Sequence, residues 1–163
     1  MVELLQKRRE ELLREQQHEK AVLPQNIDLW ERMREEAAIK ASEEPILGSY
    51  FHATVLNHSS FHAALSFRLA SKLDTPMLPT MMIRDVIEEA MSDSQDILAA
   101  AEIDVLATYT RDPACPDLST PFLYFKGFHA LQAHRVAHWL WHRGRTTLAA
   151  FFQNQISVTL GVD

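Results

Sequence analysis

The chain has 163 residues, of which 47% are hydrophobic, and its formal net charge is −6. This length suits one domain with a sizeable core, and the ordinary apolar fraction argues against a disordered chain. No apolar run of about 18 residues and no secretory signal is found, so we expect no membrane span and no export. The single cysteine, Cys115, excludes an intramolecular disulfide and indicates a reducing, cytoplasmic location. Net acidity argues against a nucleic-acid partner.

The first predicted element is a helix over about residues 1–20. The segment is rich in Glu, Leu, Arg and Gln, which are good helix formers, but its apolar stripe is thin. We therefore interpret residues 1–26 as a helical N-terminal extension at the edge of the main domain.

Apolar residues recur at helical spacing through the next hundred residues, and prolines and capping residues separate the segments. Asn26 or Asp28 can cap the first of these helices, and Glu44-Pro45 ends it because the residue before a proline is pushed out of the α region. The helices are expected at about 28–44, at 46–57, at 60–73 behind a Ser59 or Ser60 cap, at 83–90 and at 93–110.

Residues 111–121 form the longest irregular stretch, because two prolines within four residues exclude a helix there. Ser119 and Thr120 can cap a long helix over 121–143, and Gly144 is placed to end it. Large apolar groups lie on both faces of this helix, which predicts burial on two sides or a place in a subunit interface.

A last helix is expected over 145–157, and the β-branched residues of 158–162 indicate an extended strand that is just beginning. We therefore interpret residues 27–157 as an all-α domain of about seven or eight helices, and residues 158–163 as the start of a β structure that this chain does not contain.

Histidines are concentrated on the long helix, where His134, His138 and His142 recur at intervals of four. Two histidines four apart can ligate one zinc ion, but the third is roughly 12 Å from the first along the axis. No sequence neighbour completes a tetrahedral set, so we expect packing or interface histidines and predict no metal site. His129, beside Phe128, is interpreted as a hydrogen-bonded core histidine.

Asp112 is the most distinctive acidic residue, because it precedes Pro113 at a helix C-terminus, where the macrodipole disfavours a carboxylate by a few tenths to about 1 kcal/mol. Either a ligand or Arg111 compensates this cost, or Asp112 is a turn aspartate bonded to its own backbone. Cys115 has no sequence signature of a cysteine nucleophile and is interpreted as a bystander thiol.

A longer pattern carries a resemblance to a known family. Its residues are Arg111-Asp112-Pro113-Ala114, Ser119-Thr120-Pro121, Lys126-Gly127-Phe128-His129-Ala130-Leu131-Gln132-Ala133, Arg135, His138-Trp139-Leu140-Trp141, Gly144-Arg145, Phe152-Gln153 and Gly161-Val162-Asp163. Tyr50-Phe51-His52-Ala53 and the helix 83–90 belong to it as well. Over about residues 27–163 the chain resembles the N-terminal helical domain of the serine acetyltransferases.

The resemblance implies an enzyme that transfers acetyl from acetyl-CoA to L-serine, which makes O-acetyl-L-serine in the first step of cysteine biosynthesis from serine. In that family a left-handed parallel β-helix follows the helical domain, and trimers pair through the helical domains into hexamers. The resemblance also implies L-cysteine as a feedback inhibitor and O-acetylserine sulfhydrylase as a partner through a C-terminal tail, which is absent here.

By the same resemblance, Asp163 is the catalytic aspartate that orients a general-base histidine, and Asp112 contacts the ammonium group of the substrate serine. That histidine and the acetyl-CoA site would belong to the β-helix, so we expect this chain to bind no cofactor and to be inactive alone. The alternative function is a non-catalytic helical module that self-associates.

Overall fold

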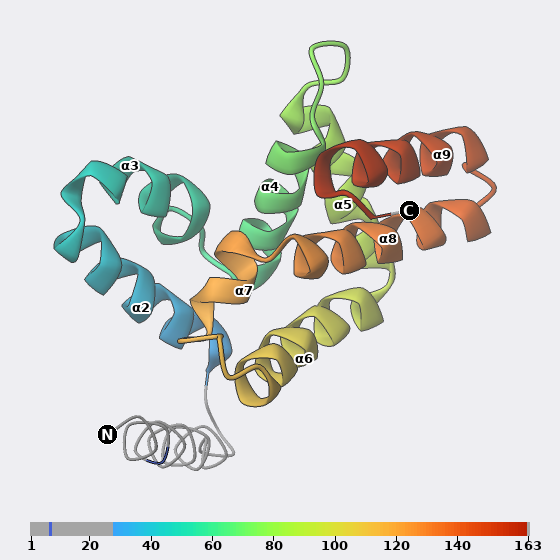
Figure 1. The fold of residues 1–163 in the computed structure, drawn as a ribbon. Helices are drawn as coiled ribbons and strands as arrows, with labels where there is room; N and C mark the ends of the chain where they lie inside the picture. Colours follow the sequence, from blue (N-terminus) through green and yellow to red (C-terminus); the bar gives the residue numbers. More distant parts are fainter. Residues whose placement is uncertain (1–6, 8–27, 163) are drawn as a thin grey trace.

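The computed structural model describes Lys7 and residues 28–162, and residues 28–162 fold into packed helices without a sheet (Figure 1). They contain eight α-helices and one isolated antiparallel bridge, between Thr75 and Leu78. The all-α prediction is therefore confirmed for this part of the chain. The helix expected over 1–20, apart from Lys7, and the candidate catalytic residue Asp163 lie outside the described residues.

The elements in chain order are α2 (Leu29–Glu43), the 3₁₀ turn η1 (Pro45–Leu47), α3 (Gly48–Phe51), the π-helical turn η2 (His52–Leu56), α4 (Phe61–Leu73), α5 (Thr80–Asp93), α6 (Gln95–Arg111), α7 (Ser119–Tyr124), α8 (Lys126–His142), α9 (Thr146–Gln155) and the π-helical turn η3 (Ile156–Leu160). Asp28 caps α2 by accepting a hydrogen bond from the N–H of Glu31 at 3.0 Å. Ser60 caps α4 by accepting from the N–H of Ala63 at 3.2 Å. Both caps match sequence predictions.

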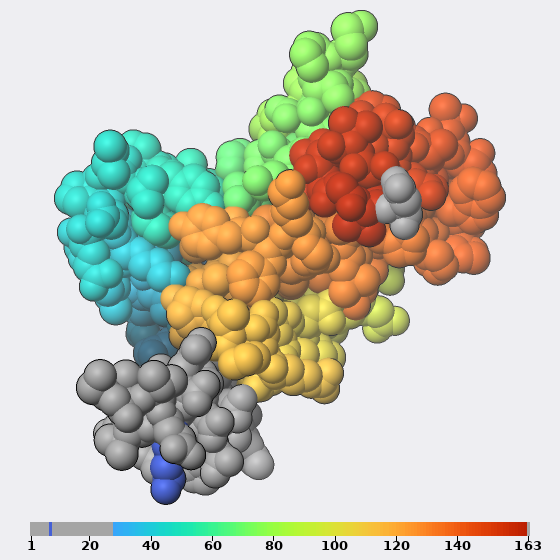
Figure 2. Space-filling model, in the orientation of Figure 1, coloured from blue at the N-terminus to red at the C-terminus, as the bar shows by residue number. Residues whose placement is uncertain are grey.

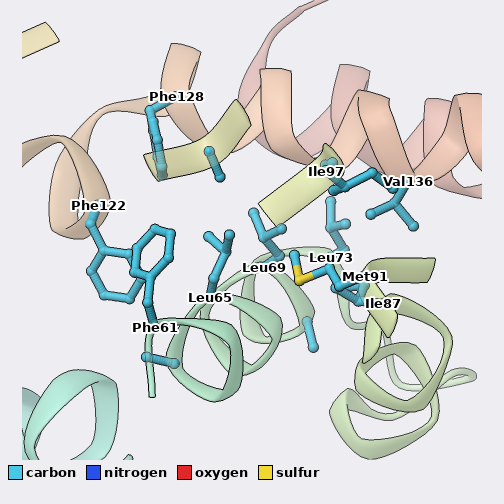
Figure 3. Close-up of a cluster of buried hydrophobic side chains, with 14 of the residues drawn as sticks. Phe61, Leu65, Leu69, Leu73, Ile87, Met91, Ile97, Phe122, Phe128 and Val136 are labelled. Carbon is cyan, nitrogen blue, oxygen red and sulfur yellow. The ribbon is translucent and has the colours of Figure 1, made fainter. Parts of the chain in front are cut away.

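The core is organised around α4, which is flanked by α5 and crossed by α8 (Figure 1). The predicted apolar face of α4 is buried, and Figure 3 shows it pointing toward side chains of α5, α6, α7 and α8. The α4 residues are Phe61, Leu65, Leu69 and Leu73. Each fully buried leucine of this face stabilises the fold by about 1.5–3 kcal/mol relative to an exposed one.

The prediction of one long helix over 121–143 is wrong, because the helix is interrupted at Phe125, whose backbone is extended with a ψ of 110°. The break leaves the last carbonyl groups of α7 without helical partners. Side chains from elsewhere satisfy them: His129 Nε2 donates to the Phe122 carbonyl at 2.7 Å, and the Arg68 guanidinium donates to that of Leu123. These bonds stabilise two helices in place of one.

The start of α7 also differs from expectation. The N-cap position is Leu118, rather than Ser119 or Thr120, and the side-chain hydrogen bond to the first turn comes from Asp117, whose Oδ1 accepts from the Thr120 N–H at 2.9 Å. The same oxygen accepts from the Thr120 hydroxyl at 2.7 Å and from the Ser119 hydroxyl at 3.0 Å. The two residues predicted as caps therefore lie in the first turn of α7 and donate to the Asp117 carboxylate.

The prediction of an extended strand from residue 158 onward is also wrong for 158–160, because these residues lie in the π-helical turn η3. Ile156 and Leu160 are buried at its two ends, and η3 packs on both α8 and α9. Burial of these two side chains outweighs the β preference of the residues between them. Gly161, with φ of 70°, then ends the helical path in the left-handed region.

Candidate functional site

An open pocket of about 580 Å³ lies where the end of α6 meets the start of α8. The two segments adjoin on the face shown in Figure 2, where they are coloured yellow to orange. The lining residues are Asp104, Ala107, Thr108, Arg111, Asp112, Pro113, Gly127, Phe128 and Leu131. A volume of this size is in the range of small-molecule sites. The sequence-predicted binding residue Asp112 is thus beside a pocket, and so is its neighbour Arg111.

Asp112 ends α6, with φ of −93° and ψ of 110°, as expected for a residue before a proline. Its N–H donates to the Thr108 carbonyl at 2.9 Å, and its Oδ1 accepts from the N–H of Ala114 at 2.8 Å. The bond to Ala114 confirms the turn-aspartate interpretation. The two oxygens of a carboxylate offer about four acceptor positions, so the bond to Ala114 is compatible with further hydrogen bonds. The turn therefore holds a carboxylate in a fixed orientation at the edge of the pocket.

One wall of the pocket is held by a polar network between α6 and α8. The Asp104 carboxylate accepts from the Gln132 amide at 2.9 Å and from the Arg135 guanidinium. Gln132 Oε1 accepts in turn from Arg135 at 2.6 Å. Gln132 is fully buried, so breaking this network would leave its amide without compensation. The network therefore fixes the distance between the two helices that form the pocket.

The loop after Asp112 is anchored to α2 by contacts that the sequence did not reveal. Lys40 Nζ lies 2.7 Å from Asp117 Oδ2 and donates to the Ser119 hydroxyl at 2.8 Å. Glu36 accepts from the Ser119 N–H at 2.8 Å. Burial raises the pKa of the Asp117 carboxyl, but the hydrogen bonds from Lys40 and Thr120 outweigh it and leave that pKa below its usual value. The charged form of Asp117 is thus the one that supports the loop.

Cys115 lies inside the same loop and is fully buried. Its Sγ donates to the Asp117 carbonyl at 3.2 Å. A thiol that is buried and hydrogen-bonded within its own loop packs as a small apolar residue. This environment fits the expected structural role and gives no sign of a nucleophile.

The α7–α8 junction contains two buried basic side chains, Arg68 and His129. Arg68 is 8% exposed, donates to the Tyr50 hydroxyl at 3.2 Å, and lies 5.5 Å from the centre of the Tyr50 ring. His129, 1% exposed, is the predicted core histidine. Burial lowers the pKa of His129 to about 4, against the opposing effect of the Phe122 carbonyl. His129 is therefore neutral and acts as a hydrogen-bond donor in the core.

The other three histidines of α8 lie on the opposite, exposed face. The prediction that His134, His138 and His142 pack inside this chain is therefore wrong. The alternative, that they lie in an interface between subunits, stays a prediction. Among residues 28–162 and Lys7, no group of three or more His, Cys, Asp or Glu side chains is arranged to hold a metal ion. Over the same residues, no helix combines the length and apolar character needed to cross a bilayer.

Comparison with known proteins gives a consistent result. The family model described as serine acetyltransferase, N-terminal, matches residues 29–133. The serine acetyltransferase of Escherichia coli strain K12 is 50% identical over 135 residues, which are 83% of this chain and 50% of that protein. The chain therefore spans about half the length of the curated relatives that it matches.

Solved structures with the same fold come from serine acetyltransferases bound to different ligands. The Neisseria gonorrhoeae enzyme in complex with serine is 45% identical, with a TM-score of 0.83 over 85% of this chain and 58% of that one. A complex with cysteine is 46% identical, with a TM-score of 0.81 over 83% of this chain and 53% of that one. A complex with CoA is 46% identical, with a TM-score of 0.82 over 83% of this chain and 58% of that one. The family match and these identities show that the chain belongs to the serine acetyltransferase N-terminal family.

Proposed function

We propose that the chain is the helical, serine-binding part of a serine O-acetyltransferase, which transfers acetyl from acetyl-CoA to the hydroxyl of L-serine. The observation that carries the proposal is the Asp112 carboxylate, which is fixed by its Ala114 hydrogen bond at the edge of a pocket of about 580 Å³. The match to the family and the serine and cysteine complexes of similar proteins support the choice of ligand. We place the activity in the cytoplasm, in keeping with a cysteine that forms no disulfide.

In this proposal Asp112 accepts hydrogen bonds from the ammonium group of L-serine, and the inhibitor L-cysteine uses the same carboxylate. A cation at this point also offsets the unfavourable position of a carboxylate at the C-terminus of α6. Asp163 orients a general-base histidine of the β-helical part and stabilises its charged form during proton transfer. Acetyl-CoA is the co-substrate and binds in that β-helical part, so the 163 residues alone are expected to give no acetyl transfer.

The test uses a chimeric enzyme in which this chain is joined to the β-helical part of the Escherichia coli relative. Serine-dependent release of CoA thiol from acetyl-CoA is the measurement. We expect turnover by the chimera and none by the 163-residue chain. Loss of all serine-dependent turnover in a folded, oligomeric chimera would contradict the proposed function.

The role of Asp112 is tested by Asp112→Asn in the chimera. Asparagine keeps an oxygen that can accept from the Ala114 N–H, so the turn survives while the charge is removed. Because a hydrogen bond between charged groups contributes about 1.5–3 kcal/mol, we expect KM for serine to rise roughly 10- to 100-fold. Asp85→Asn, at an exposed position on α5, is the matched control. Equal KM values for the two variants would refute the role of Asp112.

A second candidate function is self-association without chemistry, and it is favoured by the outer face of α8. Trp141 is 59% exposed and Leu131 is 44% exposed on that face, which is unusual for such large apolar groups. In the enzyme, the same surface would contribute to trimers that pair into hexamers. We expect Trp141→Asp to lower the sedimentation coefficient of the chain, while Thr147→Asp, at an exposed polar position, leaves it unchanged. An unchanged profile for Trp141→Asp would reject this interface.

A further inference from the structure

Two exposed histidines near the C-terminal end of α8 form a close pair. The Nε2 atoms of His138 and His142 lie 3.1 Å apart, and their ring centres lie 4.4 Å apart. In contrast, the ring centres of His134 and His138 are 6.4 Å apart. Of the three histidines on this face, these two therefore bring their Nε2 atoms within reach of one shared ion.

We propose that His138 and His142 are the two protein ligands of a site for a divalent transition-metal ion of the imidazole-binding class, such as Zn²⁺, Ni²⁺ or Cu²⁺. Two nitrogens 3.1 Å apart, each ligated at about 2.0–2.1 Å, subtend an angle of about 95–102° at the ion. This value lies between the square-planar or octahedral angle of about 90° and the tetrahedral angle of about 109°. The separation of the two nitrogens therefore suits such an ion.

Metal binding also replaces the existing contact between the rings without loss of a proton from the neutral pair. When both imidazoles are neutral, one Nε2–H donates to the other Nε2 across the 3.1 Å contact. The ion takes the place of that hydrogen, and the donor ring converts to its Nδ1–H tautomer, so that both Nε2 lone pairs face the ion. Oxygen-preferring cations such as Mg²⁺ and Ca²⁺ are not favoured by two imidazoles.

The helical turn that carries the pair is held in place from the other side. Trp139 donates to the Asp93 carboxylate at 2.8 Å, and Arg143 is paired with the same carboxylate. These two residues each follow one of the histidines in the sequence, so their attachment to the end of α5 holds the backbone of this turn in place. A site whose ligands are already in position loses less conformational entropy when it binds.

Electrostatics at this end of α8 favour a cation. The negative end of the helix dipole lies at His142, the last residue of α8. The neighbouring guanidinium groups are compensated, since Arg135 is paired with Asp104 and Arg143 with Asp93. A groove of about 610 Å³, lined in part by Asp96 and Trp139, borders all three histidines and leaves room for water in the remaining coordination positions.

The proposal departs from the sequence prediction of no metal site, and it is tested on the 163-residue chain by calorimetric titration with ZnCl₂ and NiCl₂. We expect His138→Gln and His142→Gln each to weaken binding at least tenfold. His134→Gln, one turn away on the same exposed face, is the matched control and stays within twofold of the unmodified chain. Equal affinity in all variants, or an equal loss in His134→Gln, would overturn the assignment of the site to this pair.

A second measurement gives a local readout. Bound Cu²⁺ quenches tryptophan fluorescence at short range, and Trp139 and Trp141 lie between the two ligands in the sequence. We expect micromolar Cu²⁺ to quench the unmodified chain and His134→Gln in a saturable way, and to quench His142→Gln only at concentrations at least tenfold higher. Saturable quenching at the same concentration in His142→Gln would refute the site.

Discussion

The two ends of α8 carry histidines in opposite environments. Near its N-terminal end, His129 is 1% exposed, neutral and bonded to the Phe122 carbonyl at 2.7 Å. Near its C-terminal end, His138 and His142 are exposed and face each other at 3.1 Å. The same kind of side chain therefore bonds to a backbone carbonyl in the core at one end and contacts a second exposed histidine at the other. Burial and the nearest partner, rather than the helix itself, decide which role a histidine has.

The largest effect is expected from the pH dependence of folding. His129 has a pKa of about 4 in the folded chain, against an ordinary value of 6.5. Neutral His129 contributes its full share to the stability of the fold above pH 6.5. This share is lost as the pH falls toward 4, because the unfolded chain takes up a proton at His129 that the folded chain does not. Linkage gives a loss of about 3 kcal/mol in the free energy of unfolding.

Urea unfolding between pH 7 and pH 4 measures this loss. In His129→Gln, whose amide can still donate to the Phe122 carbonyl, the slope over this range should be smaller by about one proton. Gln153→Asn, at an exposed position on α9, removes no titratable group and should keep the slope of the unmodified chain. A slope that is the same in His129→Gln and in the unmodified chain would show that the pKa of His129 is not lowered by folding.

The next effect is expected from Arg68→Met, which removes the guanidinium that donates to the Leu123 carbonyl and to Tyr50. The buried carbonyl keeps only the Tyr50 hydroxyl, at 3.3 Å. Such a loss costs about 1–3 kcal/mol, so urea unfolding at pH 7 should show a lower midpoint. Arg32→Met removes ion pairs with Glu35 and Glu36 from a guanidinium side chain that is 57% exposed, and it should cost less than about 1 kcal/mol. Similar costs for the two variants would mean that Arg68 does not stabilise the α7–α8 break.

The smallest effect is expected at the other end of α8. Without metal, His138→Gln and His142→Gln replace exposed side chains and should change the free energy of unfolding by no more than about 0.5 kcal/mol. The same urea measurement, in the presence of a chelator, checks this. A loss above 1 kcal/mol in either variant would show that the pair is a structural contact, and the contrast with His129 would disappear.

Local signals in the sequence predicted much of the fold. The caps Asp28 and Ser60 and the buried face of α4 follow from patterns within a few residues, because a cap or an amphipathic face is a property of one helix. The break at Phe125 was missed because one of its two compensating bonds comes from Arg68, more than fifty residues earlier in the chain. No local pattern contains such a long-range bond.

The site shows the same division. Asp112 was singled out by its place before Pro113, and its bond to Ala114 spans only two residues. The anchoring of its loop by Lys40 and Glu36 was not foreseen, since α2 and the loop are about eighty residues apart in the sequence. The approach of His138 to His142 depends on side-chain rotamers, which spacing alone does not define. The role of Asp163 stays a prediction.

The buried thiol of Cys115 has a practical consequence. Because it is 0% exposed and lies between Asp112 and Asp117, an alkylating reagent can reach it only when the loop opens. The rate of alkylation in the native protein therefore reports the fraction of time that the loop spends open. A ligand that binds through Asp112 should slow this reaction in proportion to its occupancy. Cys115 is thus a built-in probe of loop opening at the proposed serine site, and no added label is needed.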